Sequence, residues 1–173
     1  MLNYFMFSAI LVENRVIIDD KDAANKIHKK RGFGELIDKK LYLTVVEALY
    51  LVERGLIKVA SDNKELSFEE LLKHGLSEQN IFGKYVVFKD LKEKGYQVKT
   101  AFKYGCAFRI YRGSIEEGHA DYIIDVFMEG EKIDANILAA HVRIAHSVKK
   151  DMVFAFVDSD NDITYYLVKR MTF

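Results

Sequence analysis

The stretch from ADYIIDVFM (residues 120–128) through DANILAAHVRIAHSVKKD (134–151) to MVFAFV (152–157) decides the fold. Its first and third segments are rich in β-branched and aromatic residues, which favour strands. Its middle segment begins with Asp134, and Asp is a favoured helix N-cap. The sequence therefore predicts two strands that enclose one helix.

The enclosed helix carries two rows of residues at three- and four-residue spacing. The apolar row, which predicts one buried stripe, is Leu138, Val142, Ala145 and Val148. The other row is Ala139, Arg143, His146 and Lys150. Arg143 and Lys150 therefore project from one face of the predicted helix, two turns apart, or about 10 Å at ~1.5 Å per residue. Taken as a pattern alone, this row is typical of a solvated basic face.

More strands are predicted on both sides, in YQVKTAFKYGCAFRIYR (96–112) and ITYYLVKR (163–170). The first half of the chain is different, because it mixes short strands with short helices. Its strands are FSAILVEN (7–14), RVIID (15–19) and LIKVA (56–60), and its first helix is DKDAANKIHKKRG (20–32). Two further helices begin with the capping boxes Thr44–Glu47 and Ser67–Glu70.

The segment SEQNIFGKYVVFKDLKEKG (77–95) joins the two halves. We therefore predict an α+β protein of two small domains. Residues 1–86 form an N-terminal α+β domain, and residues 87–173 form a C-terminal catalytic domain with a mixed sheet flanked by helices.

Bulk composition narrows the functional classes. The chain has 173 residues, and half of them are hydrophobic. It carries 26 basic and 26 acidic residues, so its net charge does not favour binding to nucleic acid, and only a local basic patch could bind it. The single Cys106 excludes an internal disulfide and a cysteine-built zinc site. No apolar run reaches membrane-spanning length, and the first residues lack the basic start of a signal peptide. We expect a cytoplasmic protein with no membrane partner.

Tyr111 and His119 stand on either side of the polar loop RGSIEEG (112–118), at the mouth of a predicted hairpin. Taken singly, a strand-end Tyr is typical of filler and a loop His is typical of an idle surface residue. Their place beside each other, with Lys150 further along the chain, is what requires an explanation.

From about Phe88 onward the chain resembles the archaeal tRNA-splicing endonucleases. The resemblance rests on four segments in order: DLKEKGYQVKTAFKYGCAFRIYR (90–112), HADYII (119–124), RIAHSVKKDMVFAFVD (143–158) and TYYLVKR (164–170). The N-terminal segment LYLTVVEALYLVERGLIKV (41–59) is similar to that family as well.

The resemblance implies roles for three residues. Tyr111 matches the family's catalytic Tyr, His119 its His, and Lys150 its Lys; Lys149 is a neighbour that could be confused with Lys150. Lys150 is preferred because Asp-Met-Val follows it into the next strand, as in the family. In the implied reaction the RNA 2′-hydroxyl attacks its own phosphate, with Tyr111 as base, His119 as acid and Lys150 as electrostatic stabiliser.

Elementary chemistry agrees with these roles. Cutting RNA without a metal needs a base, an acid for the departing 5′-oxygen and a cation for the charge on phosphorus. Histidine can donate a proton near neutral pH, lysine is a compact cation, and a tyrosine can accept a proton where a nearby cation lowers its pKa. No metal and no cofactor are therefore expected, and the products would be a 2′,3′-cyclic phosphate and a 5′-hydroxyl.

The resemblance also implies a substrate and an assembly. The substrate is precursor tRNA cut at a bulge-helix-bulge, and Arg143 matches a family Arg that stacks on an unpaired base, where a surface Arg is the plainer reading. Four subunits are implied, as a homotetramer or as a heterotetramer with a structural subunit. The family's acidic loop enters a basic pocket of an opposite subunit, which here assigns Asp158, Asp160 and Asp162 to a subunit interface.

The sequence departs from the family at two places, since Ala107 stands where an acidic residue is usual and the loop from Tyr111 to His119 is short. Three metal sites are set aside. No E-x-K follows the acidic residues near Asp125, and His141 and His146 are poorly spaced on a helix to share zinc. The loop DSDND (158–162) lacks the Gly and the last acidic ligand of a calcium loop.

Two alternatives stay open beside the enzyme. One is a non-catalytic structural or RNA-binding subunit of the same assembly, for which loss of one of the three reactive residues would be the mark. The other is an unrelated α/β nuclease or binding module of similar strand order. Cleavage of an intron-bearing tRNA would separate them.

Overall fold

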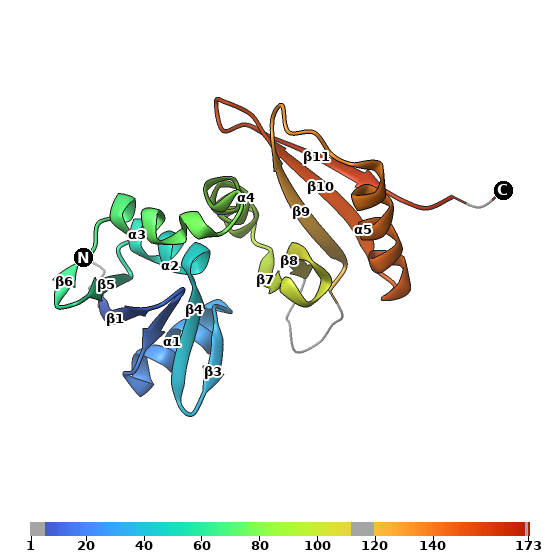
Figure 1. Ribbon diagram of the computed structural model, residues 1–173. Coiled ribbons are helices and arrows are strands. Elements are labelled where there is room, and N and C mark those ends of the chain that lie inside the picture. The colour runs from blue at the N-terminus through green and yellow to red at the C-terminus, as the bar shows by residue number, and fades with distance from the viewer. Residues whose placement is uncertain (1–5, 112–119, 172) are drawn as a thin grey trace. The chain divides into compact units, whose positions relative to one another are not determined.

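The structure is a computed structural model that describes residues 6–111, 120–171 and 173 (Figure 1). The predicted His119 lies outside the described residues. The chain divides into two compact units between Phe88 and Lys89, each with its own sheet. The prediction of an α+β protein with two small domains is confirmed, while the domain boundary after residue 86 stays a prediction because it falls inside a helix that both units share.

The N-terminal unit is built on a six-stranded sheet of order β3-β4-β2-β1-β5-β6. Its strands are β1 (Phe7–Val12), β2 (Arg15–Ile18), β3 (Glu35–Ile37), β4 (Lys40–Thr44), β5 (Ile57–Ser61) and β6 (Lys64–Glu65). The predicted β1–β2 hairpin is present, and β1 also pairs with β5 in parallel.

Helices form at the three places where the sequence predicts them, as α1 (Lys21–Arg31), α2 (Val45–Glu53) and α3 (Phe68–His74), with a 3₁₀ turn over Gly75–Ser77. Helix α4 (Ile81–Glu93) lies within the segment that was predicted to join the two halves. Both predicted capping boxes form. Gly32 ends α1 with φ 73°, a left-handed conformation that glycine adopts without strain.

The antiparallel β3–β4 hairpin was missing from the sequence prediction, which placed nothing between Gly32 and Thr44. Its two-residue turn consists of Asp38 and Lys39, both with positive φ (48° and 69°). Such a turn suits the twist of a hairpin, but neither residue is the glycine that usually announces it. The alternation in Lys40–Thr44 was the remaining signal, since Leu41 and Leu43 are fully buried.

The C-terminal unit has a mixed sheet of order β11-β10-β9-β8-β7. Its strands are β7 (Gln97–Ala101), β8 (Cys106–Tyr111), β9 (Tyr122–Met128), β10 (Asp151–Val157) and β11 (Ile163–Val168), with a 3₁₀ turn over Phe102–Tyr104. The β9–β10 pair is parallel and the other pairs are antiparallel. Helix α5 (Ala135–Ser147) crosses between the parallel strands and lies along one face of the sheet (Figure 1).

Helix α5 follows the sequence prediction in part. Asp134 is the N-cap and accepts a hydrogen bond from the Asn136 amide, as expected. Val142 and Ala145 are buried against the sheet, but Leu138 is 37% exposed, so the predicted stripe holds only in its second half. The helix also ends at Ser147, and Lys150 therefore does not continue the row that begins at Ala139.

Within the described residues, no helix is both long enough and apolar enough to cross a membrane.

Candidate active site

The turn that ends α5 separates the two neighbouring lysines. The Lys149 amide donates to the His146 carbonyl (3.1 Å) and the Lys150 amide donates to the Ala145 carbonyl (2.9 Å). This pair of bonds is a Schellman motif, and Lys149 occupies its left-handed position with φ 56°. As a result Lys149 is exposed, whereas the chain turns back at Lys150, which is half-buried.

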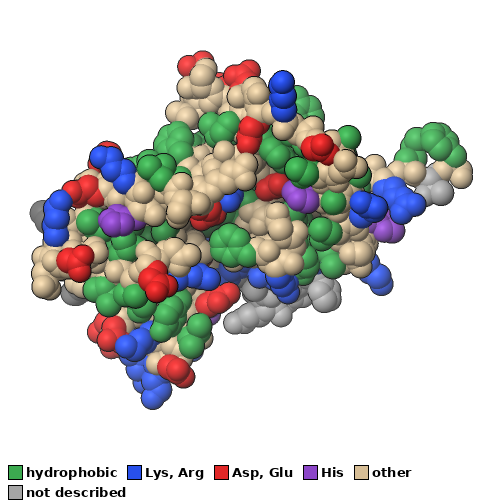
Figure 2. Space-filling view, viewed as in Figure 1, with side chains coloured by type: hydrophobic (Ala, Val, Ile, Leu, Met, Phe, Trp, Pro, Cys, Tyr) green, Lys and Arg blue, Asp and Glu red, His purple; other side chains and the backbone are tan. Residues whose placement is uncertain are grey.

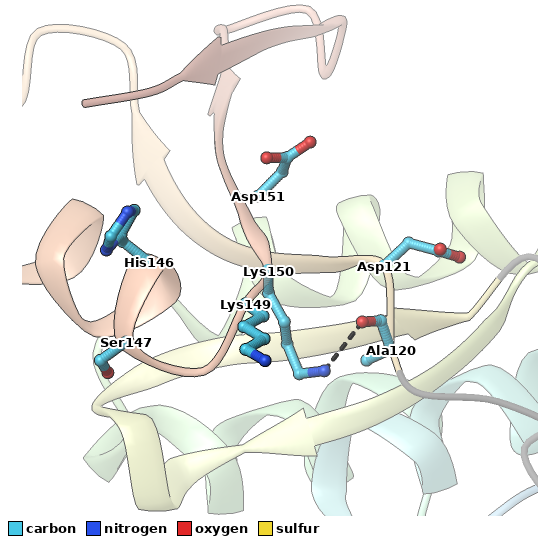
Figure 3. Close-up of a pocket in the computed structure, with 7 residues that line it drawn as sticks. All are labelled: Ala120, Asp121, His146, Ser147, Lys149, Lys150 and Asp151. Atoms are coloured by element: carbon cyan, nitrogen blue, oxygen red, sulfur yellow. Dashed lines mark hydrogen bonds between the residues drawn. The ribbon is translucent and has the colours of Figure 1, made fainter. Parts of the chain in front are cut away.

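The Lys150 side chain crosses to the neighbouring strand. Its Nζ donates a hydrogen bond of 2.9 Å to the backbone carbonyl of Ala120, just before β9 (Figure 3). An ammonium group has three donors. Among the described residues this bond is the one interaction found for Nζ, so the group has capacity left for an anion.

Backbone hydrogen bonds hold three segments together beside this lysine. The Asp121 amide donates to the Ile110 carbonyl at the end of β8 (2.8 Å). The Asp151 amide, which opens β10, donates to the Asp121 carbonyl (3.1 Å). The end of β8 and the starts of β9 and β10 therefore meet where these strands end, which we call the sheet edge at Lys150.

Tyr111 is the last residue of β8 and lies at this edge. It is 8% exposed and is paired with Gln97 of β7. Because Ile110 is bonded to Asp121, the strand places Tyr111 next to the segment that holds Ala120, the acceptor of the Lys150 bond. The two described members of the predicted catalytic set thus come from segments that meet.

An open cavity of about 750 Å³ surrounds Lys150. It is lined by Ala120, Asp121, His146, Ser147, Lys149, Lys150 and Asp151. Figure 3 shows His146 and Ser147 at the end of α5, on the opposite side of Lys150 from Ala120 and Asp121, with both aspartate carboxylates directed away from the Lys150 ammonium. The lining therefore leaves the positive charge of Lys150 available within a space large enough for a phosphodiester.

Sequence reasoning did not assign His146, Ser147, Asp121 or Asp151 to a site. His146 belonged to the same predicted row as Arg143 and Lys150, but that row was interpreted as a solvated basic face and gave His146 no role at a site. The structure places His146 near the end of α5, where it lines the cavity.

Arg143 is exposed on α5, one turn before His146, and is outside the cavity lining. On the face of the molecule in Figure 2, acidic and basic side chains are interspersed. Attraction of a polyanion must therefore come from a few placed cations rather than from the field of the whole protein.

The acidic loop between β10 and β11 is a turn organised by its first aspartate. Oδ1 of Asp158 accepts hydrogen bonds from the amides of Asp160 and Asp162, both 2.9 Å. Asp160 and Asp162 are exposed, whereas Asp158 is half-buried. Asp158 thus shapes the loop while the other two present charge to solvent.

Comparison with known proteins decides the family. Residues 7–72 match the family model described as "tRNA intron endonuclease, N-terminal domain". Residues 81–165 match the model described as "tRNA intron endonuclease, catalytic C-terminal domain". The chain belongs to the tRNA intron endonuclease family. The resemblance inferred from the sequence is thereby confirmed.

Archaeal relatives of this tRNA intron endonuclease family match nearly the whole chain. The tRNA-splicing endonuclease of Pyrococcus abyssi is 47% identical over 161 residues, which cover 92% of this chain and 94% of that protein. Those of Thermococcus onnurineus and Methanothermobacter thermautotrophicus are 45% and 41% identical, over 92% and 88% of this chain and 94% and 91% of their own lengths. Both domains of the family are therefore represented here, and the cavity around Lys150 lies in the catalytic one.

Proposed function

We propose that this protein is a tRNA-intron lyase, which cleaves precursor tRNA at bulge-helix-bulge junctions without a metal ion. One observation carries the proposal: the Lys150 ammonium bonds to Ala120 at the sheet edge where β8 ends in Tyr111. The third residue of the set, His119, directly precedes Ala120 in the sequence, and Ala120 is the acceptor of that bond. Residues 87–173 carry the chemistry in this proposal.

The reaction is a transfer of phosphorus from O5′ to O2′. Tyr111 takes the proton of the 2′-hydroxyl, and O2′ forms a bond to phosphorus. His119 gives a proton to O5′ as the P–O5′ bond breaks, so the products are a 2′,3′-cyclic phosphate and a 5′-hydroxyl. Lys150 faces the non-bridging oxygens, where negative charge grows in the transition state.

The cavity offers what this reaction needs from its surroundings. The backbone, through Ala120, fixes the direction of the Lys150 side chain before substrate arrives, and such preorganisation is the basis of electrostatic catalysis. Arg143, exposed on the helix that leads to the cavity, is placed to stack on an unpaired base of the bulge.

The deciding experiment is cleavage of an intron-bearing precursor tRNA in excess chelator, followed by analysis of the RNA ends. We expect full activity, with 2′,3′-cyclic phosphate and 5′-hydroxyl ends. Cleavage that stops with chelator and returns with Mg²⁺, or that leaves a 5′-phosphate, would refute the mechanism. A chain that binds the RNA but cuts only after a second subunit supplies its own Tyr, His and Lys would instead be the non-catalytic subunit.

We further propose that the enzyme acts as an assembly of four subunits, either four copies of this chain or copies paired with a structural subunit. Two features support this. Strand β11 is an edge of its sheet and exposes Tyr166 and Leu167 by more than half, which is a surface that proteins usually cover. The loop before it presents Asp160 and Asp162, whose charge suits a basic pocket of another subunit.

The assembly is tested by light scattering with two loop variants. Asp160→Asn with Asp162→Asn removes charge but leaves the Asp158 side chain to hold the turn, so we expect smaller assemblies, an unchanged circular dichroism spectrum and a sharp loss of cleavage. Asp158→Asn is the control, because it removes one charge from the half-buried position and keeps an amide oxygen that can accept both hydrogen bonds of the turn. Unchanged mass and full activity in the double variant would show that the loop is a turn and nothing more.

A further inference from the structure

A second cluster of chemically active side chains lies on the other part of the C-terminal sheet. Cys106 of β8, Asp125 of β9 and His141 of α5 each offer a ligand atom, and these atoms lie within 4.8 Å of one another. Cys106 is 4% exposed, and the side chains of Asp125 and His141 are 15% and 14% exposed. The cluster is therefore largely shielded, yet two of its members still reach solvent.

An irregularity in the sheet brings the cysteine to this place. Thr100 pairs with Phe108, but the next pair is Ala101 with Cys106, so the register shifts and the residue of β8 between these pairs has no partner position in β7. A bulge of this kind redirects a side chain. Cys106 accordingly joins the core under α5, together with Ile123, Val142 and Phe154.

The other two members reach the same face by regular geometry. Asp125 follows Ile123 by two positions in β9, and alternate residues of a strand share a face. Phe154 is the partner of Asp125 in β10, and its ring centre is 6.3 Å from that of His141. The packing of His141 over this strand pair sets its imidazole beside the carboxylate.

The contact between His141 and Asp125 is not a normal hydrogen bond. The Nδ1 and Oδ2 atoms are 3.2 Å apart, but the contact does not qualify as a hydrogen bond. Among the described residues, Nδ1 is buried and has no hydrogen-bond partner, which is rare for such an atom. A separation of about 3.3 Å is what two neighbouring N and O ligands show around tetrahedral Zn²⁺, given bonds of about 2.0 Å.

We propose that Cys106, Asp125 and His141, a mixed set with a single thiolate, bind one Zn²⁺ ion per chain. A thiolate and an imidazole suit Zn²⁺ better than Mg²⁺ or Ca²⁺, and the carboxylate supplies the third ligand. Water would complete the tetrahedron. On binding, the Cys106 thiol gives its proton to solvent and releases the weak S–H···O contact of 3.6 Å to the Tyr104 carbonyl.

The site is independent of the cleavage machinery. Cys106 and Tyr111 are the first and last residues of β8, a separation of about 17 Å at ~3.3 Å per residue. Zn²⁺ here would hold β8, β9 and α5 together rather than touch RNA. The proposal does not rest on the proposed function, because it concerns a metal that the reaction does not use.

The test uses Co²⁺ as a spectroscopic substitute for Zn²⁺, on the full chain after dialysis against chelator. Cys106 is the chain's one cysteine, so a thiolate-to-Co²⁺ charge-transfer band can arise from no other side chain. We expect the band to saturate at one equivalent and to disappear on adding Zn²⁺. Zn²⁺ at about 100 times its Kd should raise Tm by about 5 °C or more.

The variants are Cys106→Ala and His141→Gln, and the matched control is His74→Gln, an exposed histidine of α3 in the N-terminal unit. Both site variants should lose the Tm shift, and Cys106→Ala should lose the band as well, while the control keeps both. If His141→Gln does not fold, Cys106→Ala alone decides, because alanine fits among the apolar core residues that surround position 106. Lack of a saturable band in the wild-type chain, or a Tm shift that survives Cys106→Ala, would overturn the proposal.

Discussion

Glu47 in the N-terminal unit and Lys150 in the C-terminal unit are both charged side chains set beside a sheet, but their surroundings differ. Glu47 is 3% exposed and accepts hydrogen bonds from the Gly34 amide (2.8 Å), the Thr44 amide (2.9 Å) and the Thr44 hydroxyl (3.1 Å). Lys150 is half-buried, uses one donor on Ala120 and faces an open cavity.

The difference separates a structural charge from a chemical one. Both oxygens of the Glu47 carboxylate accept hydrogen bonds that fix β4, α2 and the loop at Gly34, and burial keeps the side chain away from a ligand. The ammonium of Lys150 is held in direction but left with free capacity. Burial alone would have ranked these two residues in the opposite order of functional interest.

The largest effect that this comparison predicts is on cleavage. Lys150→Ala should lower the rate of the chemical step by about 10²-fold or more, because it removes a charge aimed at the transition state. RNA binding should change little. Single-turnover kinetics with a precursor tRNA, together with a binding titration, measure the two quantities separately.

The adjacent lysine is the control for that change. Lys149 is exposed at the left-handed position of the turn, so Lys149→Ala should keep nearly the full cleavage rate. A large loss with Lys149→Ala and a small one with Lys150→Ala would show that the assignment is off by one residue.

The next effect in size concerns Glu47, and it appears in stability rather than in chemistry. Glu47→Ala removes the buried carboxylate that accepts hydrogen bonds from the Gly34 and Thr44 amides, so the free energy of unfolding of the N-terminal unit should fall by about 2–4 kcal/mol. Denaturant titration followed by circular dichroism measures this loss.

Glu70 provides the matched comparison, since it closes the same kind of capping box with Ser67 at a solvent-exposed helix start. Water can replace the Glu70 carboxylate there, and Glu70→Ala should therefore have a much smaller effect. Equal losses in the two variants would mean that the burial of Glu47 has no special weight.

The smallest effect comes from the turn that separates the two lysines. Lys149→Gly removes the Cβ from a left-handed position and should raise the free energy of unfolding by about 0.5–1 kcal/mol. Cleavage should be unaffected. Lys149→Ala keeps the Cβ and should bring no gain, so a stabilisation shared by both variants would point to removal of charge instead.

Local signals explain how much of the fold was predictable. Helix starts at Thr44, Ser67 and Asp134 were predictable, because each capping side chain accepts a hydrogen bond from a backbone amide two or three residues away. The residues that form these hydrogen bonds are therefore all visible in a short stretch of sequence. The β3–β4 hairpin was missed because Asp38 and Lys39 adopt positive φ without being glycines, and only the pairing across the sheet makes them do so.

The family pattern named candidate residues, whose roles stay predictions, but it did not reveal the shape of the site. Matching to a family pattern gave Tyr111 and Lys150, while the expected helix through Lys150 gave a wrong picture of how the lysine is presented. The Schellman turn depends on packing of Ala145 and Val148 against the sheet, which no residue spacing reveals. The meeting of Cys106 with Asp125 was hidden for a similar reason, since it depends on a register shift at Ala101.

The acceptor of the Lys150 bond is a main-chain carbonyl, and every amino acid would supply that oxygen at position 120. The hydrogen bond from Lys150 therefore places no constraint on the side chain at position 120. A substitution at position 150 likewise requires no compensating substitution at position 120. Over evolutionary time the two positions should drift without covariation, although their atoms touch. Methods that find contacts from correlated substitutions will pass over this pair, and a designer who transplants the site must carry the backbone path rather than a residue list.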